Sequence, residues 1–277
     1  MIRKILISLD GSAHAAAATE CGLWLSRGLD ARVSGIHVVD VAALEGPFIH
    51  DLVGSLGFEP LLNSSTKMKE ILTEVGRSIL DSFEQDCAKA GVEVETQLIT
   101  GVVTNEISER AKLSDLVIMG RKGVHERFEH GLLGSTTEGV IRKSPTPVMI
   151  VPEKFTEPRS PLIAYNGSQN AAKALHAAAE FTKTLALPLT VLTAARGDET
   201  DAILKGAEDY LKPYAVEASF ARVEDEPAVG IPAYYGEKGH DLLFMGSSHH
   251  SRVVEMVLGS TAEAVTRKVE GPVFFQK

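Results

Sequence analysis

Two kinds of hydrophobic pattern alternate along the chain. Short, continuous apolar runs such as residues 4–9 and 116–119 predict strands that are buried on both faces. Between them lie longer segments whose apolar positions recur with helical spacing. In the first half of the chain the predicted strands are 4–9, 33–39, 92–100, 116–119 and 148–151, and the predicted helices are 13–29, 67–90, 105–112 and 136–143. This alternation predicts a doubly wound α/β fold, a five-stranded parallel sheet flanked by helices.

Several parts of the sequence occur twice, in the same order. The clearest pair is LGSTTEGVIRKSPTPV and LGSTAEAVTRKVEGPV, in which ten positions are identical. Three segments recur: 7–12 at 163–168 (offset 156), 115–120 at 241–246 (offset 126), and 133–148 at 258–273 (offset 125). Three matches in one order predict an internal duplication.

A polar, proline-rich stretch, PEKFTEPRSP, separates the two copies. It predicts two tandem domains of the same fold, residues 1–154 and residues 158–277. The first copy is longer, chiefly through residues 42–65, which we interpret as a loop with room for one short helix. Loops of this length are usually functional covers or mobile insertions.

Residues suited to ligand binding follow the first and fourth predicted strands of the first copy. Ligands of open parallel sheets bind beyond the carboxyl ends of the strands, where the strand order reverses, and we expect these two strands to be neighbours there. The candidate residues at that edge are Asp10, Gly120, Arg121, Gly123, Gly134, Ser135 and Thr136.

The chemistry of these residues suits a nucleotide. Glycines allow backbone amides to approach phosphate oxygens, and Ser135 and Thr136 at a helix start offer hydroxyls and amides to an anion. Asp10 cannot favourably face a phosphate, so we expect it to contact ribose or base. The same residues are also ordinary turn and capping residues, and spacing alone leaves both interpretations open. Neither a Walker A sequence nor a GxGxxG fingerprint after the first strand is present.

These motifs resemble the universal stress protein family in its tandem-domain form, over nearly the whole chain. ATP-binding members carry an Asp after strand one, then Gly, two residues, Gly, nine residues, and Gly-Ser/Thr. Here ten residues, 124–133, separate the last two glycines. The resemblance implies an adenine nucleotide α-hydrolase-like fold and binding of ATP, with or without Mg²⁺. It assigns to the backbone of Val38 the recognition of the adenine edge.

The resemblance also implies that the final strands of the two domains pair antiparallel, so that the halves form an intramolecular pseudo-dimer. A homodimer of chains is left open. In the second copy the corresponding candidates are Asn166, Gly246, Gly259 and Ser260. Asn replaces Asp there, His249 replaces the second glycine, and no His-Val pair stands at residues 192–193. We therefore predict that the second copy binds nucleotide weakly or not at all.

The leading functional hypothesis is an ATP-binding stress-response or signalling protein that acts through nucleotide-dependent conformation or partner binding. One alternative is a weak ATPase or autophosphorylating enzyme, and another is a scaffold whose two pockets are vestigial. No catalytic residue is predicted. No metal site is predicted either, because His125 and His130 have no further ligands near them in the sequence.

Composition narrows the partners further. A net charge of −9 and a pI of about 5.5 make nucleic acid an unlikely ligand. No apolar run approaches the ~20 residues that span a membrane. Cys21 and Cys87 lie in predicted helices and are expected to be buried free thiols, because no disulfide framework is indicated. The cytoplasm is the expected location.

Overall fold

The computed structural model describes residues 2–41, 64–124, 133–197, 199–247 and 259–277. Each strand and helix predicted for the first half is present, with ends that differ by a few residues. The elements are β1 (Lys4–Ser8), α1 (Ala13–Leu29), β2 (Arg32–Asp40), α4 (Ser64–Lys89), β3 (Val94–Gly101), α5 (Val103–Ala111), β4 (Leu116–Gly120), α6 (Ser135–Lys143) and β5 (Val148–Val151). The predicted loop at 42–65 lies outside the described residues except where α4 begins.

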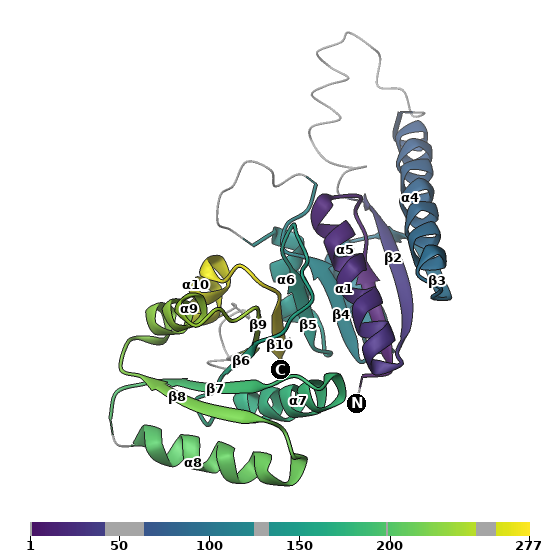
Figure 1. The fold of residues 1–277 in the computed structure, drawn as a ribbon. Coiled ribbons are helices and arrows are strands. Elements are labelled where there is room, and N and C mark those ends of the chain that lie inside the picture. The colour runs from purple at the N-terminus through teal and green to yellow at the C-terminus, as the bar shows by residue number, and fades with distance from the viewer. Residues whose placement is uncertain (1, 42–63, 125–132, 198, 248–258) are drawn as a thin grey trace.

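The second half repeats the same order of elements. They are β6 (Pro161–Ala164), α7 (Gln169–Leu185), β7 (Leu189–Ala194), α8 (Glu199–Leu211) with a 3₁₀ turn (Lys212–Tyr214), β8 (Ala218–Val223), α9 (Pro227–Glu237), β9 (Leu242–Gly246), α10 (Ser260–Lys268) and β10 (Val273–Gln276). Helices lie on both faces of the sheet (Figure 1).

All ten strands belong to one sheet, in the order β3-β2-β1-β4-β5-β10-β9-β6-β7-β8. Pairing within each half is parallel, and β1 lies between β2 and β4, as expected. The two halves meet where β5 and β10 pair antiparallel, with Phe274 opposite Met149. The predicted fold class, two doubly wound halves joined as a pseudo-dimer, is therefore confirmed. The domain bounds at 154 and 158 stay a prediction.

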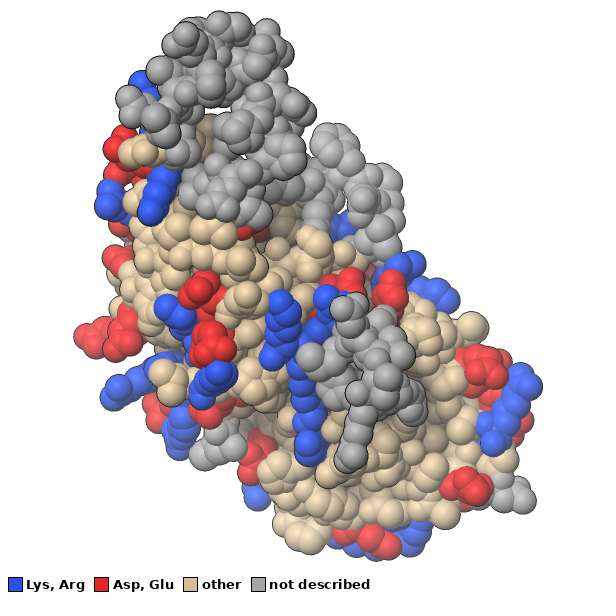
Figure 2. Space-filling model, turned by 180° about the vertical axis from the view of Figure 1, so that it is seen from behind, with Lys and Arg blue, Asp and Glu red and all other residues tan. Residues whose placement is uncertain are grey.

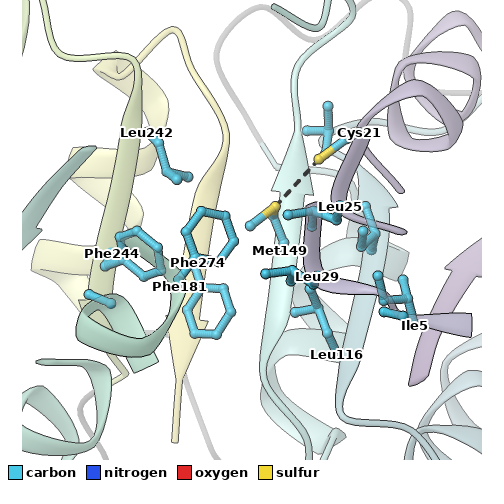
Figure 3. Packing of buried hydrophobic residues seen from close by; sticks show 14 of the residues in the cluster. Ile5, Cys21, Leu25, Leu29, Leu116, Met149, Phe181, Leu242, Phe244 and Phe274 are labelled. Atoms are coloured by element: carbon cyan, nitrogen blue, oxygen red, sulfur yellow. Dashed lines mark hydrogen bonds between the residues drawn. The ribbon is translucent and has the colours of Figure 1, made fainter. Parts of the chain in front are cut away.

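The seam between the halves is packed differently on its two sides. On the second-half side, the rings of Phe181 and Phe244 lie 5.2 Å apart and those of Phe244 and Phe274 lie 5.1 Å apart. The first-half side presents aliphatic and sulfur-containing side chains, and Cys21 Sγ lies 3.5 Å from Met149 Sδ (Figure 3). These side chains belong to one buried cluster that crosses the β5–β10 pair. The seam is thus part of the core rather than a loose domain contact.

Both cysteines are free and buried, which confirms that prediction. Burial raises the pKa of the Cys87 thiol to about 11. On the surface, acidic and basic side chains are interspersed over the face that Figure 2 shows. No helix in the described parts of the chain is long and apolar enough to cross a membrane.

Candidate ligand-binding site

One cavity of about 640 Å³ lies at the carboxyl ends of β1, β2 and β4. Its volume is within the range of small-molecule sites. Six of the predicted first-half residues line it together: Asp10, Val38, Gly120, Gly123, Ser135 and Thr136. Residues 110 or more apart in the sequence thus meet at the edge of the sheet where strand order reverses.

Asp10 ties the first strand to the loop that follows the fourth. Its Oδ1 accepts a hydrogen bond from the Ser12 amide at 2.9 Å, and its Oδ2 accepts one from the Val124 amide at 3.2 Å. A Cβ on Gly123 would lie 3.1 Å from that same Oδ2. Asp10 therefore positions the glycine-containing loop, a role that the sequence did not predict.

Gly120 is required by packing within the protein. A Cβ at this position would lie 2.6 Å from the Cβ of His14 on α1. In the second half, a Cβ on Gly246 would lie 2.6 Å from the Ala171 amide nitrogen on α7. In both halves glycine lets the strand end abut the first helix. The contact with α1, and not only the approach of a phosphate, thus accounts for glycine at position 120.

Helix α6 begins at the cavity without a side-chain cap. Its N-cap residue, Gly134, is buried and makes no side-chain capping bond, while its amide donates to the Arg121 carbonyl at 3.0 Å. Ser135, Thr136 and Thr137 of the first turn line the cavity, although Gly134 does not. Because glycine has no side chain to cap the helix, this helix start can offer backbone amides and its dipole to an anion.

Arg121 does not line the cavity, contrary to our expectation. Its guanidinium Nη2 donates to the Gly271 carbonyl of the second half at 2.9 Å. Burial lowers the pKa of Arg121, and its buried Nε has no hydrogen-bond partner among the described residues. Arg121 thus links the β4 loop to the other half of the molecule. Its neighbour Lys122 lines the cavity instead.

His37 and Lys122, the neighbours of the predicted residues Val38 and Arg121, line the cavity as well. Further lining residues had not been predicted from the sequence: Asp40 of β2, Thr137, and an apolar wall of α4 formed by Leu72, Val75 and Ile79. Asp40 could have been found from its place at the end of β2. The α4 wall carried no cue beyond its apolar stripe.

His37 is held in one orientation by the strand beside it. Its Nδ1 donates to the Leu9 carbonyl at 2.8 Å, since a carbonyl can only accept. The ring packs under α4 at Gly76, where a Cβ would lie 2.7 Å from His37 Cδ2. This contact places α4 over the end of β2 and so builds one wall of the cavity.

The second half keeps the turn after its first strand but has different residues at positions that line the cavity in the first half. Asn166 Oδ1 accepts from the Ser168 amide at 3.1 Å, as Asp10 accepts from Ser12. Thr193 Oγ1 donates to the Tyr165 carbonyl at 2.8 Å, which makes Thr193 the counterpart of His37. The corresponding pair is therefore 193–194, one residue beyond the predicted 192–193.

The remaining second-half candidates stand at the start of α10. Gly259 is the N-cap and Ser260 the first residue of this helix, as Gly134 and Ser135 are for α6. Ala262 takes the place of Thr137. His249, His125 and His130 lie outside the described residues. Within the described ranges no group of three or more His, Cys, Asp or Glu residues could hold a metal ion.

The fold and the site define a class: two copies of a doubly wound α/β domain, joined through their last strands, with a cavity at the strand ends of the first copy. The chain belongs to the universal stress protein family, whose model matches residues 1–152 and 196–276.

Individual relatives agree with this membership. The universal stress protein Slr1230 of Synechocystis sp. is 27% identical over 98% of this chain and 99% of its own length. The universal stress protein MJ0531 of Methanocaldococcus jannaschii is 34% identical over 54% of this chain and 82% of its own length. A solved universal stress protein of Archaeoglobus fulgidus shares the fold with a TM-score of 0.78 at 24% identity, covering 99% of this chain and 96% of that one.

Proposed function

We propose that the first half of this universal stress protein binds an adenine nucleotide, ATP with or without Mg²⁺, in the cavity at the ends of β1, β2 and β4. The observation that carries the proposal is that Asp10, Gly123 and the uncapped start of α6 line the same 640 Å³ cavity. A carboxylate and a helix start at one mouth suit a ligand with a polar nucleoside part and an anionic part.

The lining divides into two chemically distinct regions that match such a ligand. The start of α6 and Lys122 provide amides, hydroxyls and positive charge for phosphates. The apolar wall of α4, with Leu72, Val75 and Ile79, suits the faces of a base, and Val38 of β2 lines the same cavity.

Binding rather than turnover is the activity that the residues favour. The Asp10 carboxylate already accepts two backbone hydrogen bonds, one at each oxygen, so it is engaged in holding the loop rather than placed to activate a nucleophile. The Arg121–Gly271 bond connects the loop beside the ligand with the second half. A ligand that moves this loop would change how the halves pack, and this is the output we propose for a stress-response or signalling module.

The cytoplasm remains the proposed compartment, because both thiols are free.

Calorimetric titration of the full chain with ATP, with and without Mg²⁺, tests the proposal. We expect one site per chain, because the second half differs from the first at several of the lining positions, with Asn166, Thr193 and Ala262 in place of Asp10, His37 and Thr137. Gly123→Val should weaken binding by about tenfold or more, since its side chain would press on Asp10 and close the phosphate side of the cavity. Gly206→Ala on α8 is the matched control, because a Cβ there meets nothing within 4 Å.

Two results would contradict the proposal in different ways. Absence of both binding heat and thermal stabilisation at several millimolar ATP would favour the scaffold with vestigial pockets. Rapid phosphate release that is lost in Gly123→Val would favour the alternative of an ATPase.

A further inference from the structure

The internal repeat creates two equivalent surfaces, one along α1 and one along α7. The two helices correspond at the offset of 156 found in the sequence, and both are capped by a serine, Ser12 and Ser168. The offset pairs the following residues: Trp24 with Glu180, Leu25 with Phe181, Arg27 with Lys183, and Cys21 with Ala177.

The surface along α1 is covered by the segment that joins the two halves. After β5 the chain runs along this helix, and the ring of Phe155 lies 5.9 Å from that of Trp24. Two residues later, Glu157 Oε1 lies 3.8 Å from Arg27 Nη2. The covering segment thus contributes one large apolar side chain and, two residues on, one carboxylate.

The segment ends at an aspartate that also has a counterpart. Asp241 accepts hydrogen bonds from the amides of Arg159 and Ser160, at 2.7 and 2.8 Å. In the first half, Asp115 accepts from the amides of Arg3 and Lys4, at 2.8 and 2.9 Å. An aspartate therefore anchors the start of β1 in the same way as another anchors the start of β6. The two surfaces correspond in this feature as well.

The surface along α7 is an open groove of about 700 Å³. It follows the helix from Gln169 to Thr184 and ends beside Ile2, where the amino-terminal end of the described chain and α7 lie side by side (Figure 1). Its apolar lining includes Leu29, Ala172, Ala177, Phe181 and Phe274. Of the α7 residues that correspond to Trp24 and Arg27, Glu180 lines this groove, and Lys183 stands directly before the lining residue Thr184.

We infer that the groove along α7 binds an extended peptide segment of a partner protein, with a bulky apolar side chain beside Phe181 and a carboxylate two residues later that pairs with Lys183. We infer these two side chains from the linker on α1, where Phe155 contacts Trp24 and Glu157 lies beside Arg27. On α7, Glu180 occupies the position of Trp24, so this position offers no aromatic ring to the segment. His176 Nε2 lies 3.9 Å from Glu180 Oε1. The groove therefore binds such a segment more weakly than α1 holds the linker, and reversibly.

The inference is independent of nucleotide binding. Ser114, Asp115, Thr146 and Pro147 line the groove just ahead of β4 and β5, whereas the cavity described above lies beyond the opposite ends of the first-half strands. Failure of one proposal leaves the other standing.

A peptide with the linker sequence, PEKFTEP, is the probe. Titrated into the ¹⁵N-labelled full chain, it should shift the amide resonances of α7 and the end of β10, saturating by about 2 mM. The same peptide with Phe155→Ala should bind about tenfold more weakly or worse. Lys183→Glu in the protein should weaken binding about two- to fivefold.

The control protein variant is Lys89→Glu, the same charge change at the far end of α4. It should bind the peptide as the unmodified chain does. No saturable shift up to about 2 mM, or shifts located away from α7, would overturn the inference. A concentration-dependent dimer that Lys183→Glu dissociates would also overturn it, because the occupant would then be a second copy.

Discussion

The two halves of the molecule share a scaffold, and several of their differences fall on residues that line the first-half cavity. Both halves keep the left-handed glycine of the first turn (Gly11 with φ 78°, Gly167 with φ 73°) and the serine cap that follows. Three polar residues that line the first-half cavity are replaced in the second half: Asp10 by Asn166, His37 by Thr193, and Thr137 by Ala262. Ser135 and Thr136 also line the cavity and recur as Ser260 and Thr261, so the second half keeps one part of this residue set and has lost another.

The largest effect should come from the shared glycines of β4 and β9. Gly120→Ala and Gly246→Ala should each destabilise the protein by about 1–3 kcal/mol or more, because each new Cβ lies 2.6 Å from an atom of the neighbouring helix. Urea and thermal unfolding measure this, with Gly206→Ala as the unstrained control. If Gly120→Ala left stability unchanged and abolished only ATP binding, the shared role would be disproved.

Exchange of Asp10 and Asn166 should have the next largest effect. Asp10→Asn keeps one acceptor for the Ser12 amide and loses the bond to the Val124 amide. We expect about a tenfold loss of ATP affinity, about 1.4 kcal/mol, with little change in stability. The reciprocal Asn166→Asp should leave the stoichiometry at one. A second binding site in Asn166→Asp would show that this single residue accounts for the difference between the halves.

The His37 position should give a smaller effect. His37→Ala removes the hydrogen bond to the Leu9 carbonyl and should cost about 1 kcal/mol of stability. His37→Thr introduces the residue that makes the equivalent bond in the second half, and should recover part of that loss. Equal losses in both variants, measured by urea unfolding, would argue against equivalence of the two positions.

The smallest effect concerns pH. Burial is the main cause that lowers the pKa of His14, whose second-half counterpart is Asn170. Below pH 6.5 the unfolded chain therefore binds a proton that the folded chain takes up only at lower pH, so stability should fall as the pH decreases from 6.5. The slope should stay below the one-proton limit of about 1.4 kcal/mol per pH unit. His14→Asn should reduce the pH dependence of stability measured in thermal melts between pH 5 and 7. An unchanged slope in this variant would show that other groups cause the pH dependence.

The fold could be predicted because its determinants are local. Continuous apolar runs specify buried strands, and the repeat specifies that the second half follows the first. Asp10, Gly123 and Ser135 could be assigned to one cavity because the carboxyl ends of β1 and β4 meet at the same edge of a parallel sheet.

What could not be predicted depends on contacts between distant parts of the chain. The side chain of Arg121 turns away from the cavity because its acceptor, the Gly271 carbonyl, is 150 residues away across the seam. The wall formed by Leu72, Val75 and Ile79 depends on which face α4 turns to β2, and this follows from the contact of Gly76 with His37. The one-residue error at Thr193 arose because the counterpart of β2 offers no sequence identity to align.

The antiparallel pairing of β5 with β10 has a consequence for how such a protein can diverge. Because both strands belong to one polypeptide, their association is unimolecular and persists at any dilution. Moreover, a substitution occurs once per assembly, whereas in a two-fold symmetric pair of identical chains it would occur twice. Covalent fusion thus frees each copy from its twin, and one copy can lose a ligand contact or open a surface while the other retains its own.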